Sequence, residues 1–258
     1  MLDMSIERSD IAQSEGELLP SVTESLRVIY EKYAGEGLKA VYLWGSVTTT
    51  DFDIRTSDVD GIGVVGDQTD IALEEKIKYE LEAQHPEVVK FGFRLVHESE
   101  LSGKMKPVSP LASVILPRLL LLDMPHWTYV AGEKYEVSDF TDNPPTPAEG
   151  LYWRLEQMKN KGWADIRDVE KGKEQRVSKI LWRIVYLFEL MSGDKGSFSY
   201  SAVCQNAGEE MTPYVHALNE LKSSGYDRAV FEKDLPLFED LVEKAKQFSE
   251  SIQREIQK

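Results

Sequence analysis

Apolar residues recur every three or four positions in two stretches of the first half of the chain, the spacing of one face of an α-helix. The first stretch, 21–33, carries Val22, Leu26, Val28, Ile29 and Tyr33, and the second, 71–83, carries Leu73, Ile77 and Leu81. We therefore expect a helix over each stretch.

Shorter apolar runs lie between and after these stretches. Runs 39–44, 61–65 and 88–96 are rich in β-branched or aromatic residues, which favours strands. The run Leu111–Leu122 predicts a buried helix, because a helix that spans a membrane needs roughly 20 apolar residues. The order helix, strand, strand, helix, strand is typical of an α/β or α+β domain.

The second half of the chain has almost no strand pattern. Apolar stripes at helical spacing cover 177–191 (Ile180, Leu181, Ile184, Leu187, Phe188, Met191) and 235–256 (Leu237, Leu241, Ala245, Phe248, Ile252), and they predict a helical bundle. Three prolines within Thr141–Pro147 interrupt regular structure between the halves. We therefore expect a domain over 1–140, a proline-rich linker over 141–150 and a helical domain over 151–258.

Charge changes this picture, because it is unevenly distributed. The 258 residues include 45 acids and 30 bases, a net charge of −15. Residues 1–150 hold 27 acids against 13 bases, so nearly all of the net charge belongs to the first half. A protein that binds duplex DNA needs a positive surface to displace counterions, so duplex nucleic acid is not an expected partner.

The chain contains one cysteine, Cys204, which excludes an intrachain disulfide and a thiolate zinc site. Met1–Pro20 is acidic and has no apolar stretch of the kind found in signal peptides. We therefore expect a cytoplasmic protein without a membrane partner, and the sequence does not predict its oligomeric state.

One motif combines a turn with two carboxylates. The strand expected at 39–44 runs into Gly45-Ser46, and Ser57, Asp58 and Asp60 precede the strand at 61–65. The period of a strand places Asp58 and Asp60 on one face, where they repel each other unless a cation lies between them. Carboxylate oxygens favour Mg²⁺, and a Gly-Ser turn offers close backbone approach and a hydroxyl for a phosphate. The conjunction predicts a magnesium–nucleotide site for phosphoryl or nucleotidyl transfer, although each part alone is common in solvated turns.

The motif resembles the signature of the DNA polymerase beta-type nucleotidyltransferase superfamily, and within it the aminoglycoside adenylyltransferases of the streptomycin/spectinomycin type. Leu119–Leu122, Tyr129–Gly132 and the 177–186 stretch with Arg183 also resemble those enzymes. The resemblance implies an α+β fold, a nucleotidyltransferase domain with a mixed sheet followed by an all-α domain. It implies that Gly45, Ser46 and Ser57 bind ATP and that Asp58 and Asp60 hold two Mg²⁺ ions. AMP would pass to a hydroxyl of a small acceptor, such as an aminoglycoside-like compound, and pyrophosphate would leave.

The family's third carboxylate, the base for the acceptor hydroxyl, has no evident counterpart. The strand expected at 88–96 contains no acid, and the matching position falls near Phe91 or Gly92. Glu87, just upstream, is our candidate for this catalytic role, and Glu98 and Glu100 are weaker candidates. General-base catalysis contributes about 10²–10⁴-fold, so metal ions and positioning can still accelerate the reaction without it.

The helical half supplies further candidates. Residues 159–183 carry eight bases and four acids, and Lys179 and Arg183 share a helix face. This segment either faces the triphosphate, which would make Lys179 and Arg183 nucleotide-binding residues, or is a solvated face. Trp163 offers a flat wall for a sugar ring, and with Asp165 and Asp168 it is the candidate acceptor-binding set. The acidic first half suits a cationic acceptor, and it is equally what solubility alone requires.

Three functions therefore stay open. The first is an ATP- and Mg²⁺-dependent adenylyltransferase acting on a small hydroxylated acceptor. The second is the same chemistry on a protein, against which the large helical half argues. The third is a catalytically weak or inactive nucleotidyltransferase-fold protein that binds nucleotide or a partner as an antitoxin-like module, which the acid-free strand favours.

Overall fold

The computed structural model of the chain describes residues 4–49, 52, 57–115, 117–193, 203–205 and 207–256. It divides into two compact units, Met1–Pro144 and Pro145–Lys258. The boundary lies within the proline-rich segment 141–147, where regular structure is interrupted. Each unit is described by itself below.

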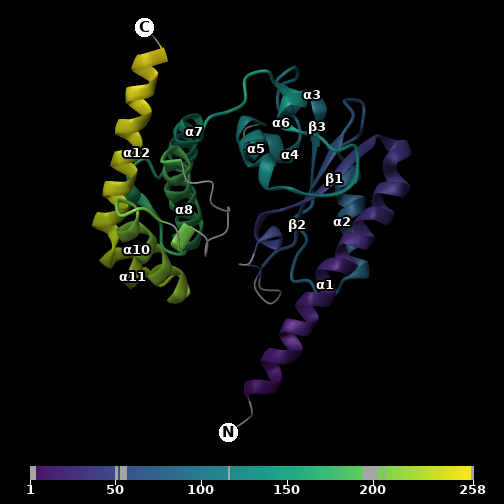
Figure 1. Ribbon diagram of the computed structural model, residues 1–258, viewed down its shortest axis with the longest axis horizontal. Helices are drawn as coiled ribbons and strands as arrows, with labels where there is room; N and C mark the ends of the chain where they lie inside the picture. Colours follow the sequence, from purple (N-terminus) through teal and green to yellow (C-terminus); the bar gives the residue numbers. More distant parts are fainter. Residues whose placement is uncertain are drawn as a thin grey trace. The chain divides into compact units, whose positions relative to one another are not determined.

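The first unit is built on a four-stranded mixed sheet (Figure 1). Its strands are β1 (Leu38–Trp44), β2 (Asp60–Val65), β3 (Arg94–His97) and β4 (Thr128–Gly132). Their order is β3-β2-β1-β4, with β1 antiparallel to both β2 and β4 and β2 parallel to β3. The strands expected at 39–44 and 61–65 are confirmed, and they are the two central strands.

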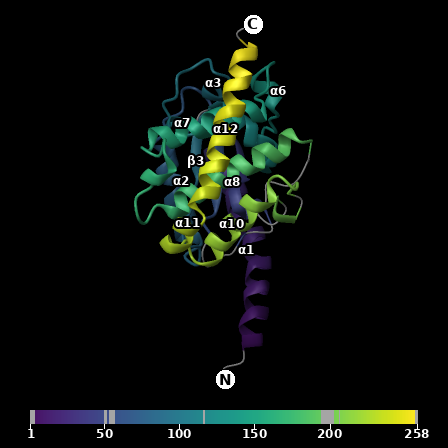
Figure 2. The same ribbon diagram turned by 90° about the vertical axis from the view of Figure 1, so that its left-hand side faces the viewer.

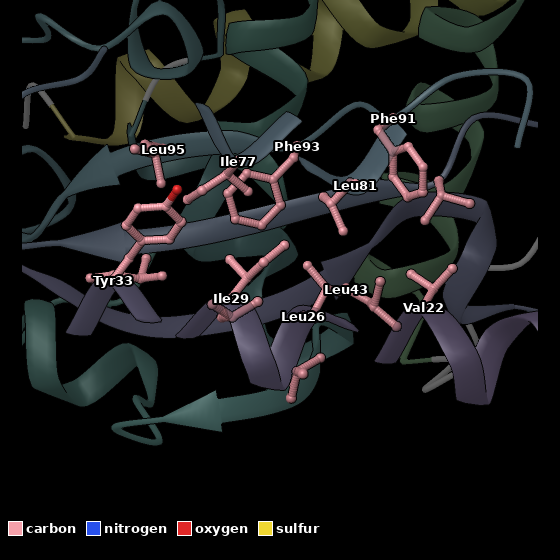
Figure 3. Packing of buried hydrophobic residues seen from close by; sticks show 14 of the residues in the cluster. Val22, Leu26, Ile29, Tyr33, Leu43, Ile77, Leu81, Phe91, Phe93 and Leu95 are labelled. Atoms are coloured by element: carbon pink, nitrogen blue, oxygen red, sulfur yellow. The ribbon is translucent and has the colours of Figure 1, made fainter. Parts of the chain in front are cut away.

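Helices α1 (Met4–Tyr33) and α2 (Leu73–Gln84) cover one face of this sheet. Figure 3 shows Leu26 and Ile29 from α1 and Ile77 and Leu81 from α2 packed around Phe93. All five side chains are almost fully buried. The helical spacing of apolar residues at 21–33 and 71–83 thus marks the faces that pack on the sheet, although α1 begins earlier than the pattern predicts.

The opposite face is covered by shorter helices: α3 (Glu98–Leu101), α4 (Pro110–Val114), α5 (Pro117–Asp123) and α6 (Val137–Phe140). The single buried helix expected over Leu111–Leu122 is therefore wrong. It is divided into α4 and α5, and α5 begins at Pro117. A proline lacks the N–H of a helical hydrogen bond and disfavours helical geometry in the residue before it, so it ends one helix and starts the next.

The third strand also differs from the expectation of 88–96. Strand β3 begins only at Arg94, and before it Phe91 forms an isolated parallel bridge with Val59. The N–H of Val88 donates to the carbonyl of His85 at 3.1 Å and closes a turn, so that part of the run does not join the sheet. Strand β4, which the apolar pattern did not predict, pairs with the other side of β1.

The second unit is helical in its described part, as expected. Its principal helices are α7 (Pro147–Asn160), α8 (Glu174–Met191), α10 (Thr212–Ser223), α11 (Arg228–Lys233) and α12 (Leu235–Ile256). Helix α8 packs against α7, α10 and α12, and α12 is the long yellow helix in Figure 2. The short 3₁₀ helices of the chain are η1 (Ala34–Glu36), η2 (Gly45–Thr48), η3 (Met124–His126) and η4 (Ile166–Asp168).

In the described ranges of the chain, no helix is both long enough and apolar enough to cross a membrane.

Candidate functional site

The turn and the carboxylates of the motif meet at one end of the two central strands. Trp44, the last residue of β1, pairs with Asp60, the first residue of β2, and the chain turns directly into η2 at Gly45. Ile62 and Val64 belong to the buried cluster on the α4–α5 face, so strand alternation places Asp60 on that face too. This pairing places Gly45 beside Asp60, and the roles of Gly45, Ser46 and Asp60 in a site stay predictions.

The Asp60 carboxylate lies between two glycines. Gly45 has a φ of +80°, and a Cβ there would lie 2.9 Å from Asp60 Oδ2. A Cβ at Gly92 would lie 1.9 Å from Asp60 Oδ1, a distance that no pair of non-bonded atoms tolerates. Glycine at both positions is therefore a requirement for this position of the carboxylate, and at Gly45 the left-handed backbone adds to it.

The segment just before β3 aligns with the two aspartates residue by residue. The N–H of Val59 donates to the Lys90 carbonyl at 3.0 Å, and the N–H of Gly92 donates to the Val59 carbonyl at 2.9 Å. These bonds place Lys90 beside Asp58 and Gly92 beside Asp60. Lys90 Nζ lies 3.2 Å from Asp58 Oδ2, in an ion pair whose side chains are 61% and 41% exposed. The two positions that face the aspartate pair thus carry a lysine and a glycine.

Glu87, the candidate third carboxylate, is engaged elsewhere. Its Oε1 lies 3.2 Å from His85 Nδ1, and His85 Nε2 lies 2.9 Å from Ser25 Oγ of α1. The chain turns at His85–Val88, before Phe91 joins the sheet, so Glu87 does not reach the strand position beside Asp60. Gly92 lies beside Asp60, so the catalytic role of Glu87 stays a prediction, which its contact with His85 does not favour.

The weaker candidates, Glu98 and Glu100, lie beyond the far end of β3. Glu98 forms an ion pair with Lys39 and accepts a hydrogen bond from the Tyr135 hydroxyl at 2.7 Å. Burial, together with Glu98 and Glu133, raises the pKa of the Tyr135 hydroxyl. Within the residues that the structure describes, no three His, Cys, Asp or Glu side chains form a group that could hold a metal ion.

Glu100 has a structural role that its burial makes clear. It is fully buried, and it accepts hydrogen bonds from the N–H groups of His97, Val108 and Ser109 at 2.8, 2.5 and 2.7 Å. Burial alone raises the pKa of a carboxyl, but these donors outweigh it and lower the pKa of Glu100. The carboxylate anchors the loop before α4.

Two serines flank the carboxylates. Ser46 lies in η2, where its carbonyl accepts a hydrogen bond from the Thr49 N–H at 2.9 Å. Ser57 comes directly before Asp58, and both serines are half-buried. Their predicted role in holding a nucleotide stays a prediction.

The basic candidates of the helical unit lie one turn apart on α8. Lys179 is exposed and Arg183 is half-buried. The helix expected there is confirmed, while nucleotide binding by these two residues stays a prediction.

Trp163 is more deeply buried than an acceptor-stacking residue would be. It is 3% exposed, and its Nε1 donates to Glu170 Oε2 at 2.9 Å. It contributes to the wall of a cavity of about 270 Å³ between α7 and α12, with Tyr152, Met158 and Lys246. Its use as a flat wall for a sugar ring stays a prediction, which this burial does not favour.

Asp165 and Asp168 are both exposed. Asp165 caps η4 by accepting a hydrogen bond from the Arg167 N–H at 2.9 Å, and it lines a second cavity of about 410 Å³. The two cavities share Ala164, Val242 and Lys246. Both belong to the helical unit.

Sequence reasoning did not name Lys90, and it named Gly92 only as one of two positions near which the third carboxylate would fall. In the run Val88–Val96, Lys90 and Gly92 are two residues apart, as Asp58 and Asp60 are, which is the period of a strand. Reading it required the parallel alignment of the two strands, which only the structure supplies.

Comparisons with known proteins agree with this architecture. No protein-family profile matches the chain, and no curated protein matches its sequence. Among solved structures, the chain is similar to the crystal structure of spectinomycin adenyltransferase AAD(9) from Enterococcus faecialis with ATP and spectinomycin. The TM-score is 0.55 at 12% identity, over 88% of this chain and 98% of that one. The likeness confirms the predicted fold class: an α+β nucleotidyltransferase fold followed by a helical domain.

Proposed function

We propose that the protein is a Mg²⁺-dependent nucleotidyltransferase that transfers AMP from ATP to a hydroxyl of a small acceptor. The observation that carries the proposal is the position of the Asp60 carboxylate. It lies between Gly45 and Gly92 at the Gly-Ser turn, and Asp58 lies two residues before it in the sequence. The fold shared with an adenyltransferase crystallised with ATP and spectinomycin supports AMP as the transferred group and an aminoglycoside-like acceptor.

The donor set of the site fits Mg²⁺. This ion takes one or two carboxylates and completes its shell with water and phosphate oxygens, so Asp58 and Asp60 would hold it together with the nucleotide. When bound, the ion neutralises charge on the phosphates and polarises them. The backbone of Gly45-Ser46 and the Ser46 hydroxyl would contact phosphate oxygens, and Ser57 lies close enough in sequence to assist.

The reaction balances without a redox partner. The acceptor hydroxyl oxygen forms a bond to the α-phosphorus, the bond from that phosphorus to the bridging oxygen breaks, and pyrophosphate leaves. The hydroxyl proton passes to solvent, because the strand beside Asp60 carries Gly92 where a carboxylate base would lie. Lys179 and Arg183 would neutralise the remaining phosphate charge, and Asp165 and Asp168 would pair with ammonium groups of the acceptor.

The proposal is tested with ATP labelled on its α-phosphate. Wild-type protein is incubated with labelled ATP, Mg²⁺ and a panel of aminoglycosides and aminocyclitols, and the products are separated. We expect labelled AMP on a small molecule, and loss of at least about 10²-fold in rate for Asp58→Asn and Asp60→Asn. The matched control is Asp142→Asn, which makes the same charge change at an exposed residue outside the site.

A second function, nucleotide or partner binding with little catalysis, is favoured by one observation. Lys90 and Gly92 occupy the positions that face the aspartate pair, so the site lacks a carboxylate base there. This alternative predicts nucleotide binding by wild-type protein without labelled product, even when a cell lysate is added. Label on a protein from the lysate would instead indicate AMP transfer to a macromolecule.

A further inference from the structure

We propose that the helical unit binds a small aromatic amine in the two adjoining cavities beside α12. The ring would lie in the apolar cavity between α7 and α12, and the ammonium would lie among the carboxylates of the second cavity. The inference goes beyond the proposed function, because this site needs neither nucleotide nor Mg²⁺, although Asp165 belongs to both proposals.

The first cavity has the size and the wall of a site for one aromatic ring. Its volume is about 270 Å³, and a cavity of about 150 Å³ already holds one benzene molecule. Pockets for small molecules are mostly apolar, with a few polar groups that fix the orientation of the ligand. The apolar side chains of this wall are Tyr152, Leu155, Met158, Trp163 and Val242.

One polar side chain in this cavity points to a ligand. Ser249 of α12 lines the cavity and is 6% exposed, and its hydroxyl has no hydrogen-bond partner among the residues that the structure describes. Ser251 on the same helix shows the usual arrangement, because its hydroxyl donates to the Phe248 carbonyl at 2.7 Å. A buried hydroxyl without a partner is costly, and a ligand hydroxyl in the cavity would remove this cost.

The second cavity, of about 410 Å³, supplies negative charge. Four acids and two bases line it, a net charge of −2, and one of these acids, Glu239, is paired with Arg167. Within the described part of the chain, the other three acids accept hydrogen bonds from neutral groups and form no ion pair; they are Asp165, Asp240 and Glu243. A neutral donor leaves the charge of a carboxylate in place, so this cavity attracts a cation.

The two cavities adjoin, so that one elongated molecule can occupy both. Ala164, Val242 and Lys246 line each of them, and Lys246 Nζ donates to the Ala164 carbonyl at 3.3 Å. Ser249 and Glu243 are six residues apart on α12, a rise of about 9 Å along the helix. A ligand with a hydroxyl at one end, a ring in the middle and an ammonium at the other end matches this order of groups.

The probe that tests the inference is tyramine, which carries a phenol hydroxyl and an ammonium at opposite ends. Its binding to the full chain is measured by isothermal titration calorimetry in the absence of nucleotide and Mg²⁺. We expect phenethylamine, which lacks the hydroxyl, to bind about threefold to tenfold more weakly than tyramine. We expect hydroxyphenylpropionate, which carries the opposite charge, to bind at least about tenfold more weakly.

Two serines of α12 give matched variants. Ser249→Ala should lower the affinity for tyramine to that for phenethylamine and leave the affinity for phenethylamine unchanged, because only the contact with the hydroxyl is lost. Ser251→Ala, at an exposed serine of the same helix, should change neither affinity. Glu243→Gln should weaken the binding of both amines, because it removes a negative charge from the second cavity.

The absence of tyramine binding at millimolar concentration would overturn the inference, as would equal affinity for tyramine and hydroxyphenylpropionate. An affinity for tyramine that Ser249→Ala does not change would also overturn it, because the amine would then bind elsewhere. Circular dichroism of each variant establishes that it is folded. Because the titrations contain no nucleotide, their failure leaves the proposed function in place, and failure of AMP transfer leaves this site in place.

Discussion

The position of the Asp60 carboxylate depends on two neighbouring residues that have no Cβ. Gly45 and Gly92 lie against its two oxygens, and either side chain would occupy space that the carboxylate now fills. In many sites a carboxylate is held by hydrogen-bond donors. Here two glycines give the carboxylate the space that it fills, which is why we regard them as part of the site.

Gly92→Ala tests this dependence. The new Cβ would lie 1.9 Å from Asp60 Oδ1, so the carboxylate must move. We expect cation-dependent binding of an ATP analogue to weaken by about tenfold, which corresponds to about 1.4 kcal/mol, as measured by isothermal titration calorimetry. The matched control is Gly66→Ala, where the nearest atom to a new Cβ is 3.6 Å away. Unchanged affinity in Gly92→Ala would contradict the steric argument.

Glu100 gives a prediction about stability at the same scale. Its pKa is lowered below the ordinary 4.5 because three N–H donors stabilise the carboxylate. A carboxyl whose pKa is lower in the folded state contributes stability above its unfolded pKa, and this contribution disappears as the pH falls through the folded pKa. The free energy of unfolding should therefore decline below about pH 4.5.

Glu100→Gln replaces one of the two accepting oxygens with an NH₂ donor, which then faces backbone N–H donors. We expect it to lower the free energy of unfolding at neutral pH by about 1–3 kcal/mol, measured by urea denaturation. The variant should also lose the part of the acid dependence that belongs to Glu100. A profile with the same acid decline as wild-type protein would show that other carboxyls produce it. Glu82→Gln, on the exposed side of α2, is the control.

Single residues also show where sequence reasoning succeeds. Asp58 and Asp60 were recognisable because two carboxylates at strand period beside a Gly-Ser turn form an unusual combination. Glu87 was chosen because it is the acid nearest in sequence, whereas the residue beside Asp60 is set by pairing between segments, and that residue is Gly92. Trp163 was proposed as a wall for a sugar ring because its burial and its contact with Glu170 are not visible in a periodic pattern.

Among the elements, α2 shows how the first unit is held together. Its Ile77 and Leu81 are fully buried against the sheet, while Tyr79 on the same helix is 74% exposed. The parallel connection from β2 through α2 to β3 brings Lys90 and Gly92 to the aspartates. Packing of α2 therefore determines the alignment of the site as well as the stability of the unit.

Leu81→Ala tests how much the packing of α2 on the sheet contributes to the stability of the unit. The loss of a fully buried leucine side chain costs about 2–5 kcal/mol of unfolding free energy, which chemical denaturation measures. Tyr79→Ala is the matched control on the same helix and should change stability by no more than about 0.5 kcal/mol. Equal effects of the two substitutions would mean that α2 does not pack on the sheet as described.

Elements with a clear hydrophobic period were predictable, and those that depend on a partner were not. The central strands and the helices at 71–83, 177–191 and 235–256 follow from local pattern, since each buries one face or both. Strand β4 is only five residues long, and it is identified by its antiparallel pairing with β1. The turn at His85–Val88 shortened the third strand, and Pro117 divided the apolar run Leu111–Leu122 between two helices.

For the whole molecule, the net charge of −15 is best described by halves. Residues 1–150 hold the aspartate pair and nearly all of the net negative charge, and the rest of the chain is almost neutral. The likeness to an adenyltransferase structure extends over 88% of the chain, so both halves have counterparts there. The order of elements left α/β and α+β open and the resemblance of the motif implied the α+β class, whereas the acceptor depends on side chains that pattern does not locate.

Cation-dependent nucleotide binding is the most direct test of the account, because it examines the aspartate site without assuming an acceptor. Binding of a non-hydrolysable ATP analogue is measured by calorimetry with and without Mg²⁺, for wild-type protein, Asp60→Asn and Asp142→Asn. We predict binding that requires Mg²⁺, is at least about tenfold weaker in Asp60→Asn, and is unchanged in Asp142→Asn. Equal affinity in wild-type protein and Asp60→Asn, or binding that ignores Mg²⁺, would contradict the account.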